Sequence, residues 1–170
     1  FALKSQEKSL KAQKDNRFND EIINFKIKSK NDEINFNKDE HPREGINLES
    51  LSRLKPVFKK DGTVTAGNAS GINDGAAAVT LMSADEAEKR SLQKLVSIKS
   101  WASCGVDPAV MGTGPIPASK KALEKAGWSI NDVDLFEINE AFAAQSIAVV
   151  RTLSIPEDKV NVNGGAIALG

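Results

Sequence analysis

The sequence predicts an α/β fold in which helices cover both faces of a parallel or mixed sheet. Short apolar runs, which suit buried strands, occur at Gly75–Met82, Leu95–Trp101, Leu135–Ile138 and Val160–Asn163. Helical patterning alternates with them, most clearly at Ala141–Leu153, which is apolar nearly all round. Strands that alternate with helices indicate a sheet covered on both sides. A hydrophobic content of 40% over 170 residues allows a buried core and excludes a disordered or fibrous chain.

Three further helices have recognisable start or stop signals. Ala2–Asp15 reads as a helix that ends at Asn16, because asparagine tolerates the left-handed conformation of helix ends. Ser83–Arg90 opens with a capping-box pattern. Pro115–Ala126 has prolines at its entrance and Gly127 just past its end. These signals predict where each helix begins and ends.

The first third of the chain has a different pattern from the remainder. Residues 23–27 alternate apolar and polar side chains, as a half-buried strand does. Residues 34–36 predict a second strand after a polar turn at residues 30–32, and residues 38–49 read as a loop. Residues 1–60 carry 14 basic and 10 acidic side chains with one glycine, whereas the other eleven glycines follow. This shift predicts two structural units that meet near residues 55–72.

Overall charge and composition exclude several classes of protein. Twenty-three basic residues balance twenty-three acidic ones, which argues against a generic nucleic-acid or membrane-surface binder. No apolar run approaches the ~18 residues that span a bilayer. A single cysteine excludes an internal disulfide framework and favours a reducing compartment.

Two single residues are candidates for chemistry on type alone. Cys104 follows a predicted strand, with no evident base or helix start to activate its thiol, so a structural role is favoured over a nucleophilic one. His41 lies in a charged loop and is predicted to be a solvated surface residue. One cysteine and one histidine do not make a structural zinc site. The carboxylates form no evident acid–base pair.

Asn139 stands out because it joins an apolar strand to an apolar helix. In α/β folds this junction presents ligand groups, and a buried asparagine must be hydrogen-bonded. Capping of the helix is the alternative, and the local sequence leaves both open. The glycine-rich phrases Gly67–Gly75 and Gly164–Gly170 match neither a phosphate loop nor a dinucleotide fingerprint, so tight packing competes with ligand contact there.

Four phrases, taken together, resemble one family. Gly62–Gly71 (GTVTAGNASG), Met111–Ala118 (MGTGPIPA), Asn139–Ala143 (NEAFA) and Asn161–Gly170 (NVNGGAIALG) resemble the thiolases, most closely the biosynthetic acetyl-CoA acetyltransferases. The resemblance extends over the whole chain in the family's order. It implies the thiolase fold in part: a mixed sheet covered by helices, with part of an inserted loop domain.

The resemblance implies a defined chemistry. Thiolases condense two acetyl-CoA molecules to acetoacetyl-CoA and CoA, or run the reverse thiolysis, by a ping-pong scheme through an acyl-cysteine. The family's two catalytic cysteines and its histidine have no match here, and the resemblance places them before Phe1 and after Gly170. We therefore expect an internal fragment that is inactive alone. A degradative 3-ketoacyl-CoA thiolase and a non-catalytic CoA-binding protein are the alternatives.

The resemblance also assigns site residues. Asn139 matches the asparagine that holds an oxyanion-hole water, where fixed donors stabilise developing enolate charge. Ten residues match the family's CoA and thioester surface: Ser70, Ala66, Gly67, Ala69, Phe58, Met111, Ala141, Phe142, Arg43 and Ser50. Ser70 would contact the pantetheine arm, the apolar residues would line the thioester tunnel, and Arg43 and Ser50 would lie near the adenine nucleotide.

The resemblance divides the chain into three parts. Residues 1–71 would be the latter part of the CoA-covering loop domain, residues 72–93 the end of the N-terminal half, and residues 94–170 most of the C-terminal half. No metal or other cofactor is expected, because the CoA thioesters are substrates. The expected partners are acetyl-CoA and acetoacetyl-CoA, without nucleic acid or membrane. A cytoplasmic homo-oligomer, dimer or tetramer, is expected for the complete protein.

Overall fold

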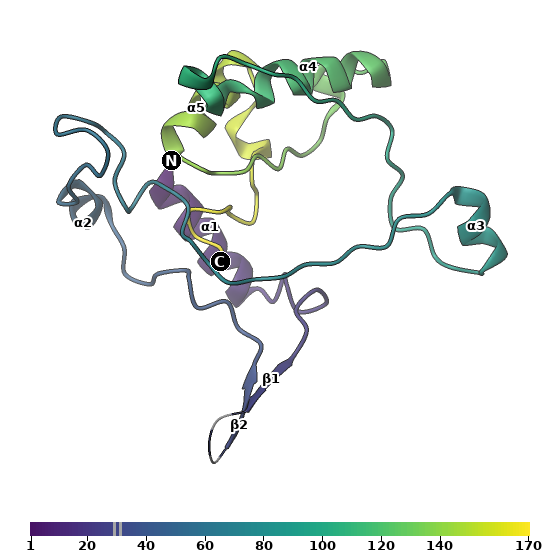
Figure 1. The fold of residues 1–170 in the computed structure, drawn as a ribbon, viewed down its shortest axis with the longest axis horizontal. Coiled ribbons are helices and arrows are strands. Elements are labelled where there is room, and N and C mark those ends of the chain that lie inside the picture. The colour runs from purple at the N-terminus through teal and green to yellow at the C-terminus, as the bar shows by residue number, and fades with distance from the viewer. Residues whose placement is uncertain (29, 31) are drawn as a thin grey trace.

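The computed structural model describes residues 1–28, 30 and 32–170. Helix α1 lies at the centre, and both chain termini lie against it (Figure 1). Helices α4 and α5 lie together on one side, whereas the β1–β2 hairpin and α3 project away from the rest. The elements are α1 (Ala2–Lys14), β1 (Phe25–Lys28), β2 (Glu33–Phe36), α2 (Leu48–Ser52), α3 (Ala84–Lys89), α4 (Pro115–Ala126) and α5 (Ala143–Thr152), with 3-10 turns η1 (Pro108–Thr113), η2 (Ile130–Asp132) and η3 (Glu157–Lys159).

The helix ends lie close to the predicted positions. Helix α1 is followed by Asn16 in the left-handed region, at φ 55°. Helix α4 ends at Gly127, which has φ 70°, and the Trp128 amide donates to the Leu123 carbonyl at 3.0 Å. The Ser83 side chain accepts from the Glu86 amide at the start of α3. The predicted end signals of these helices are therefore confirmed.

The hairpin forms where alternation predicted it. Strands β1 and β2 are antiparallel, with Phe25 opposite Phe36 and Lys28 opposite Glu33. Asn31, in the predicted turn, lies outside the described residues. The prediction of half-buried strands is wrong, because every residue of both strands is exposed. No described segment covers either face of this ribbon, so the alternation has no buried side.

The main apolar core lies under helix α5. Its buried members are Val149, Val150, Leu153, Ile155 and Val160, with Ile116, Ile130, Phe136 and Ile138 packed against them. These side chains come from α4, from α5 and from two chain segments that meet at a parallel bridge between Phe136 and Val160. The core therefore holds both the segment that precedes α5, through Phe136 and Ile138, and the helix itself, through Val149 and Val150.

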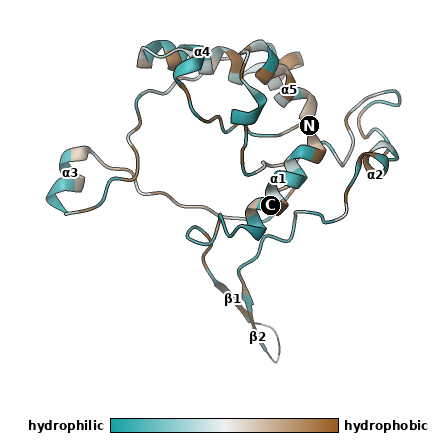
Figure 2. Cartoon of the chain, turned by 180° about the vertical axis from the view of Figure 1, so that it is seen from behind, coloured by the Kyte–Doolittle hydropathy of each residue, from teal (hydrophilic) through white to brown (hydrophobic). Residues whose placement is uncertain are grey.

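Two predicted buried strands are extended segments without strand partners. Gly75–Met82 and Leu95–Trp101 form no ladder with any part of the chain that the structure describes. Val79 and Val96 are each 85% exposed. Figure 2 shows apolar colour along these segments on either side of α3. A strand needs a neighbour for its backbone hydrogen bonds, and these two have none here. The predicted strands at Leu135–Ile138 and Val160–Asn163 reduce to the single Phe136–Val160 bridge.

The described part of the chain contains no helix that is long and apolar enough to cross a membrane.

Candidate functional site

The turn around Ser70 docks on the segment that starts α5. The Ser70 amide donates to the Ala141 carbonyl at 3.0 Å, and the Ala143 amide donates to the Asn68 carbonyl at 2.8 Å. Ala69 and Phe142 form an antiparallel bridge between these two bonds. Two of the four phrases singled out in the sequence, Gly62–Gly71 and Asn139–Ala143, are thus joined by backbone hydrogen bonds.

Asn68 organises this turn, and sequence reasoning did not single it out. Its Oδ1 accepts from the Thr65 amide at 2.8 Å, and its Nδ2 donates to the Thr63 carbonyl at 2.9 Å. Asparagine side chains commonly close turns in this way, which was the available signal. The side chain shapes the turn while the backbone carbonyl binds it to α5.

An apolar edge borders the docked turn. The rings of Phe58 and Phe142 meet edge to face, with centroids 6.0 Å apart and an angle of 81° between their planes. Phe58 is 73% exposed, Ala141 is half-buried, and Ala66 and Ser70 are exposed. The structure therefore brings most of the predicted tunnel and pantetheine residues to one surface and leaves them accessible.

Gly67 packs closely against two leucines, which favours the tight-packing alternative for this turn without testing ligand contact. A Cβ at this position would lie 2.5 Å from Leu54 Cδ1 and 2.6 Å from Leu51 Cδ2. The close approach is therefore to Leu51 of α2 and to Leu54, which lies two residues beyond that helix. A groove runs between this turn, α1, α2 and the start of α5; its lining residues are Phe1, Ala2, Leu3, Leu48, Leu51, Ser52, Leu54, Thr63, Val64, Thr65, Gly67, Asn68, Ala143, Ala144 and Ile147.

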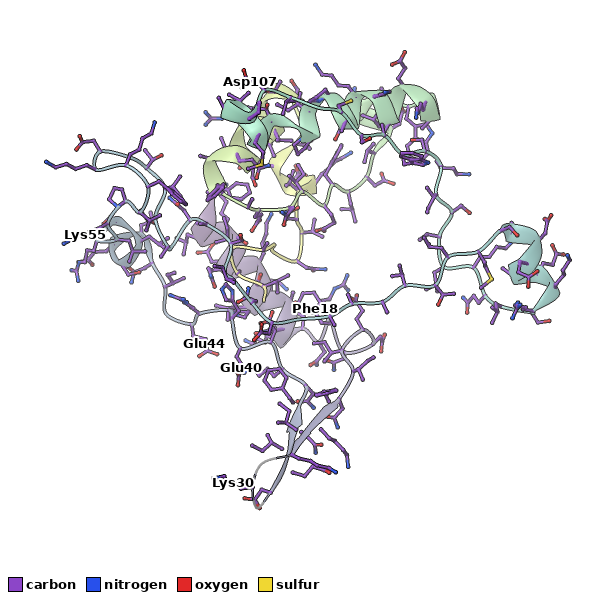
Figure 3. The ribbon with its side chains drawn as sticks, in the orientation of Figure 1. Phe18, Lys30, Glu40, Glu44, Lys55 and Asp107 are labelled. Carbon is purple, nitrogen blue, oxygen red and sulfur yellow. The ribbon has the colours of Figure 1, made fainter. Side chains whose placement is uncertain are left out.

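Met111 lies on η1, which packs against α5. A Cβ on Gly112 would lie 2.7 Å from Gln145 Cγ, so the backbone of η1 lies directly against the helix. Met111 itself is 67% exposed. Asp107, labelled in Figure 3 at the start of η1, holds this turn by accepting from the Ala109 amide at 2.8 Å. The structure brings Met111 to the α5 side of the molecule with its side chain accessible.

Arg43 and Ser50 are less closely tied to this surface. The Arg43 amide donates to Gln6 Oε1 at 2.9 Å, and its side chain is exposed. Ser50 belongs to the capping box of α2: its amide donates to Asn47 Oδ1 at 2.9 Å and its hydroxyl accepts from the Asn47 amide at 3.1 Å. Neither residue is hydrogen-bonded to the Ser70 turn within the described part of the chain.

Asn139 differs from its sequence prediction in two respects. It is exposed, and its side chain makes no hydrogen bond to any residue that the structure describes. The expectation of a buried asparagine is wrong, since no described segment covers this loop. The capping alternative is wrong too, because the N-cap of α5 is Phe142, without a side-chain cap. The amide group is therefore free to meet a ligand or a water.

The residue next to Asn139 is the most buried large polar group of the structure. Glu140 is 1% exposed. Its Oε2 accepts from Ser5 Oγ at 2.6 Å and from the Ile167 amide at 3.2 Å, and its Oε1 accepts from Asn161 Nδ2 at 2.9 Å. These donors come from α1, from the chain after the Phe136–Val160 bridge and from the glycine-rich end. Sequence reasoning missed this network, because its members are far apart along the chain.

Asn161 holds the backbone just before Asn139. The Ile138 amide donates to Asn161 Oδ1 at 2.7 Å, and Asn161 Nδ2 donates to the Ile138 carbonyl at 2.8 Å. Asn161 is 2% exposed and has φ 44°. Its side-chain amide bonds both the N–H and the C=O of Ile138, as a neighbouring strand would. The same Nδ2 also donates to Glu140. One side chain thus fixes both neighbours of Asn139.

Electrostatics near this loop affect Glu137. Partial desolvation raises the pKa of this carboxyl, and repulsion from the Glu140 carboxylate adds to the rise, whereas Lys8 opposes it. Lys4 of α1 forms an ion pair with Glu157 of η3 at 2.8 Å. The hydrogen bond from Lys4 and its positive charge lower the pKa of the Glu157 carboxyl. Both effects lie on the α1 side of the Asn139 loop.

His41 and Cys104, the two residues first considered for chemistry, are both half-buried. His41 is half-buried, and its Nδ1 lies 2.8 Å from the Ala168 carbonyl, so the prediction of a solvated surface residue is wrong. Its loop folds back onto the glycine-rich end, which sequence could not show. Cys104 is half-buried and unpaired. No group of three or more metal-ligating side chains occurs among the described residues.

The chain is similar in sequence to acetyl-CoA acetyltransferases of several bacteria. The chain is 58% identical over its full length to the acetyl-CoA acetyltransferase of Rhizobium meliloti and 59% identical to that of Shinella zoogloeoides. In both cases the match covers 100% of this chain and 43% of the relative. The chain therefore spans less than half the length of the relatives it matches.

Two solved structures superpose closely on this chain. The acetyl-CoA acetyltransferase of Bacillus anthracis has a TM-score of 0.96 and 52% identity, and the match covers 99% of this chain and 43% of that one. Human mitochondrial 3-ketoacyl-CoA thiolase in complex with CoA has a TM-score of 0.92 and 50% identity, with 99% and 42% covered. The predicted fold class is confirmed: this is part of the thiolase fold.

Family models account for nearly the whole chain. The N-terminal domain of thiolase matches residues 1–85, and the C-terminal domain of thiolase matches residues 92–170. The N-terminal match precedes the C-terminal match along the chain. The chain belongs to the thiolase family.

Proposed function

We propose that the chain is part of an acetyl-CoA C-acetyltransferase that condenses two acetyl-CoA molecules to acetoacetyl-CoA and CoA. The reverse thiolysis would use the same acyl-cysteine chemistry. Asn139 would hold the oxyanion-hole water, and the Ser70 turn would take the pantetheine arm. No metal or other cofactor is needed for this chemistry, since CoA thioesters are the substrates.

One observation supports this proposal most directly. The Ser70 turn is hydrogen-bonded to the Asn139–Ala143 segment at both ends of the Ala69–Phe142 bridge. This contact joins the turn that carries the exposed Ser70 to the segment that begins with the exposed Asn139. A thioester needs this combination: an apolar channel for its arm and a donor for the oxygen that becomes an enolate.

The proposal divides the catalytic parts between this chain and the remainder of a full-length protein. Residues 1–71 would belong to the CoA-covering loop domain, residues 72–93 to the N-terminal half and residues 94–170 to the C-terminal half. The complete protein would be a homo-oligomer in the cytoplasm and would serve lipid metabolism. The acyl-accepting cysteine and the catalytic histidine would lie outside these 170 residues.

Thiolysis of acetoacetyl-CoA by purified proteins tests the proposal. We expect turnover by the full-length protein and none by the 170-residue chain, because Cys104 and His41 do not act as the family's catalytic pair. Cys104→Ser in the full-length protein should leave the rate unchanged. Turnover by the 170-residue chain alone would show that the active site has been misplaced.

Asn139→Ala tests the role of the amide within the same protein. Loss of a direct oxyanion donor costs about 10²- to 10³-fold in turnover. Because Asn139 would act through a water that other groups also hold, we expect roughly a ten- to few-hundred-fold loss in kcat for condensation. The KM for acetyl-CoA and the Tm should stay close to normal, since the side chain is exposed and caps no helix. A wild-type kcat would remove Asn139 from the mechanism.

A degradative 3-ketoacyl-CoA thiolase is the second candidate. It is favoured by the match to human mitochondrial 3-ketoacyl-CoA thiolase, with a TM-score of 0.95 and 50% identity. Thiolysis of acetoacetyl-CoA compared with a medium-chain 3-ketoacyl-CoA discriminates the two. The proposal expects a clear preference for acetoacetyl-CoA in kcat/KM. Binding of CoA without any turnover by the full-length protein would support a non-catalytic CoA-binding protein instead.

A further inference from the structure

We infer that the buried Glu140 carboxylate is a positioning residue, which sets Asn139 relative to the glycine-rich turn at Gly164–Leu169. This inference rests on the proposed function, in which Asn139 meets the reacting thioester through a water. Glu140 touches no substrate in this arrangement, because it is 1% exposed and faces the protein interior. It acts through the residues that it holds.

The first argument is the match between the carboxylate and its donors. An ionised carboxylate only accepts hydrogen bonds. Glu140 accepts one from a hydroxyl, one from a side-chain amide and one from a backbone amide. Each donor comes from a different segment, so Glu140 ties Ser5 of α1, Asn161 and Ile167 to one point. A buried carboxylate that accepts three hydrogen bonds from three segments favours one arrangement of those segments.

The second argument is the position of Asn139 between two fixed residues. Asn161 holds Ile138 through two hydrogen bonds of 2.7 and 2.8 Å, and it holds Glu140 through a third. Asn139 itself is exposed, and its side chain is hydrogen-bonded to none of the described residues. The backbone fixes the Cα–Cβ direction of Asn139 and therefore the region that its amide group can reach, and this backbone is held from both sides by buried polar hydrogen bonds.

The third argument concerns the glycine-rich turn. A Cβ on Gly165 would overlap the Glu140 carboxyl group, so the turn packs directly on it. Ser5 Oγ, which donates to Glu140, also accepts from the Gly165 amide at 3.1 Å. The carboxylate, the Ser5 hydroxyl and the turn form one connected unit. A shift of Glu140 must move both the Asn139 loop and the turn.

Glu140→Gln in the full-length enzyme keeps the shape and volume of the side chain but replaces one acceptor oxygen by an NH₂ donor, so the side chain no longer matches its three donors. Whichever way the new amide is oriented, its NH₂ group faces a donor. A displacement of about 1 Å in a site can cost up to 10²-fold in rate, so we expect kcat to fall about tenfold while KM for acetyl-CoA is unchanged. In the Asn139→Ala background, the same substitution should lower kcat by no more than about twofold, because the group being positioned is gone.

Two serines on α1 provide a matched control. Ser5 and Ser9 are both buried, at 3% and 0% exposure, and both lie against the glycine-rich turn. Ser5 Oγ donates to Glu140, whereas Ser9 Oγ makes no hydrogen bond within the part of the chain that the structure describes. Ser5→Ala should lower kcat about threefold through loss of one bond to a carboxylate. Ser9→Ala, which also trades a buried hydroxyl for a methyl, should leave kcat at the wild-type value.

The outcomes separate this inference from the function on which it rests. An inactive full-length wild-type protein would contradict the proposed function. An active enzyme in which Glu140→Gln and Asn139→Ala multiply their effects on kcat would overturn the inference alone. If Glu140→Gln does not fold, the serine pair decides: equal kcat values for Ser5→Ala and Ser9→Ala overturn the inference, and a selective loss in Ser5→Ala supports it.

Discussion

Ser70 presents its side chain freely while its backbone is fixed. Its amide binds the Ala141 carbonyl at 3.0 Å, and its side chain is exposed beside the Phe58–Phe142 edge. Ser70→Leu in the full-length enzyme should therefore leave the fold intact and fill the space of the pantetheine arm. We expect a higher KM for acetyl-CoA, with Tm near the wild-type value. Normal acetyl-CoA binding would reduce this turn to a packing element.

Gly164 tests how tightly α1 is packed on the glycine-rich turn. It has φ +83°, and an added Cβ would overlap the Ser9 hydroxyl and lie 2.7 Å from the Ser5 carbonyl oxygen. Gly45 has φ +74° and open space around it, so Gly45→Ala isolates the backbone strain of about 1 kcal/mol. Gly164→Ala adds overpacking, and we expect a loss of roughly 2 to 5 kcal/mol in total. Urea unfolding of the full-length variants measures both; equal losses would contradict the packing seen here.

At the scale of single residues, the sequence indicated which segments to consider better than it explained their individual residues. The phrases around Ser70 and Asn139 predicted two segments that the structure joins. At Gly67 the sequence left tight packing and ligand contact open, and in the structure Leu51 and Leu54 occupy the space that a side chain would fill. Glu140 gave no local signal, because its partners Ser5 and Ile167 are 135 and 27 residues away. Buried polar networks depend on such long-range contacts, and a local pattern does not contain them.

Helix α2 combines a structural and a predicted ligand role in one residue. Asn47 and Ser50 form its capping box: the Asn47 side chain accepts from the Ser50 amide, and the Ser50 hydroxyl bonds both the amide and the carbonyl of Asn47. Asn47→Ala and Ser50→Ala should each lower stability by about 1 kcal/mol, because each opens the cap. If Ser50 also lies near the adenine nucleotide, only Ser50→Ala should raise the KM for acetyl-CoA further. Tm and KM for the matched pair check this, and equal KM values would restrict Ser50 to the cap.

Elements with end signals were predicted well, and elements that need partners were not. Asn16 and Gly127 marked helix ends, because left-handed residues are a local requirement. The runs at Gly75–Met82 and Leu95–Trp101 have strand character in the sequence, but strands form only when a neighbour supplies hydrogen bonds. In the described residues these runs stay extended and exposed. The sequence therefore predicted their tendency to pair and not their state here.

At the scale of the whole molecule, apolar surface dominates the regions around α3. Val79, Leu95, Val96 and Trp101 are between 73% and 87% exposed. Exposed apolar patches of this extent favour association. The chain spans 43% of the length of the relatives it matches, and a full-length protein of their length would have further chain to supply neighbouring strands. We propose that these extended runs become sheet strands there.

Val96→Lys should have opposite effects in the two molecules. In the 170-residue chain the side chain is 85% exposed, so a lysine removes apolar surface and adds charge. We expect less self-association, measured by light scattering at fixed concentration. In the full-length protein the same position would be buried in a completed sheet, where an unpaired charge costs several kcal/mol, roughly 3 or more. Urea unfolding of that variant should show the loss, with Lys94→Ala as the control on the same segment. Unchanged stability of full-length Val96→Lys would mean that this run stays exposed and is not a strand of the sheet.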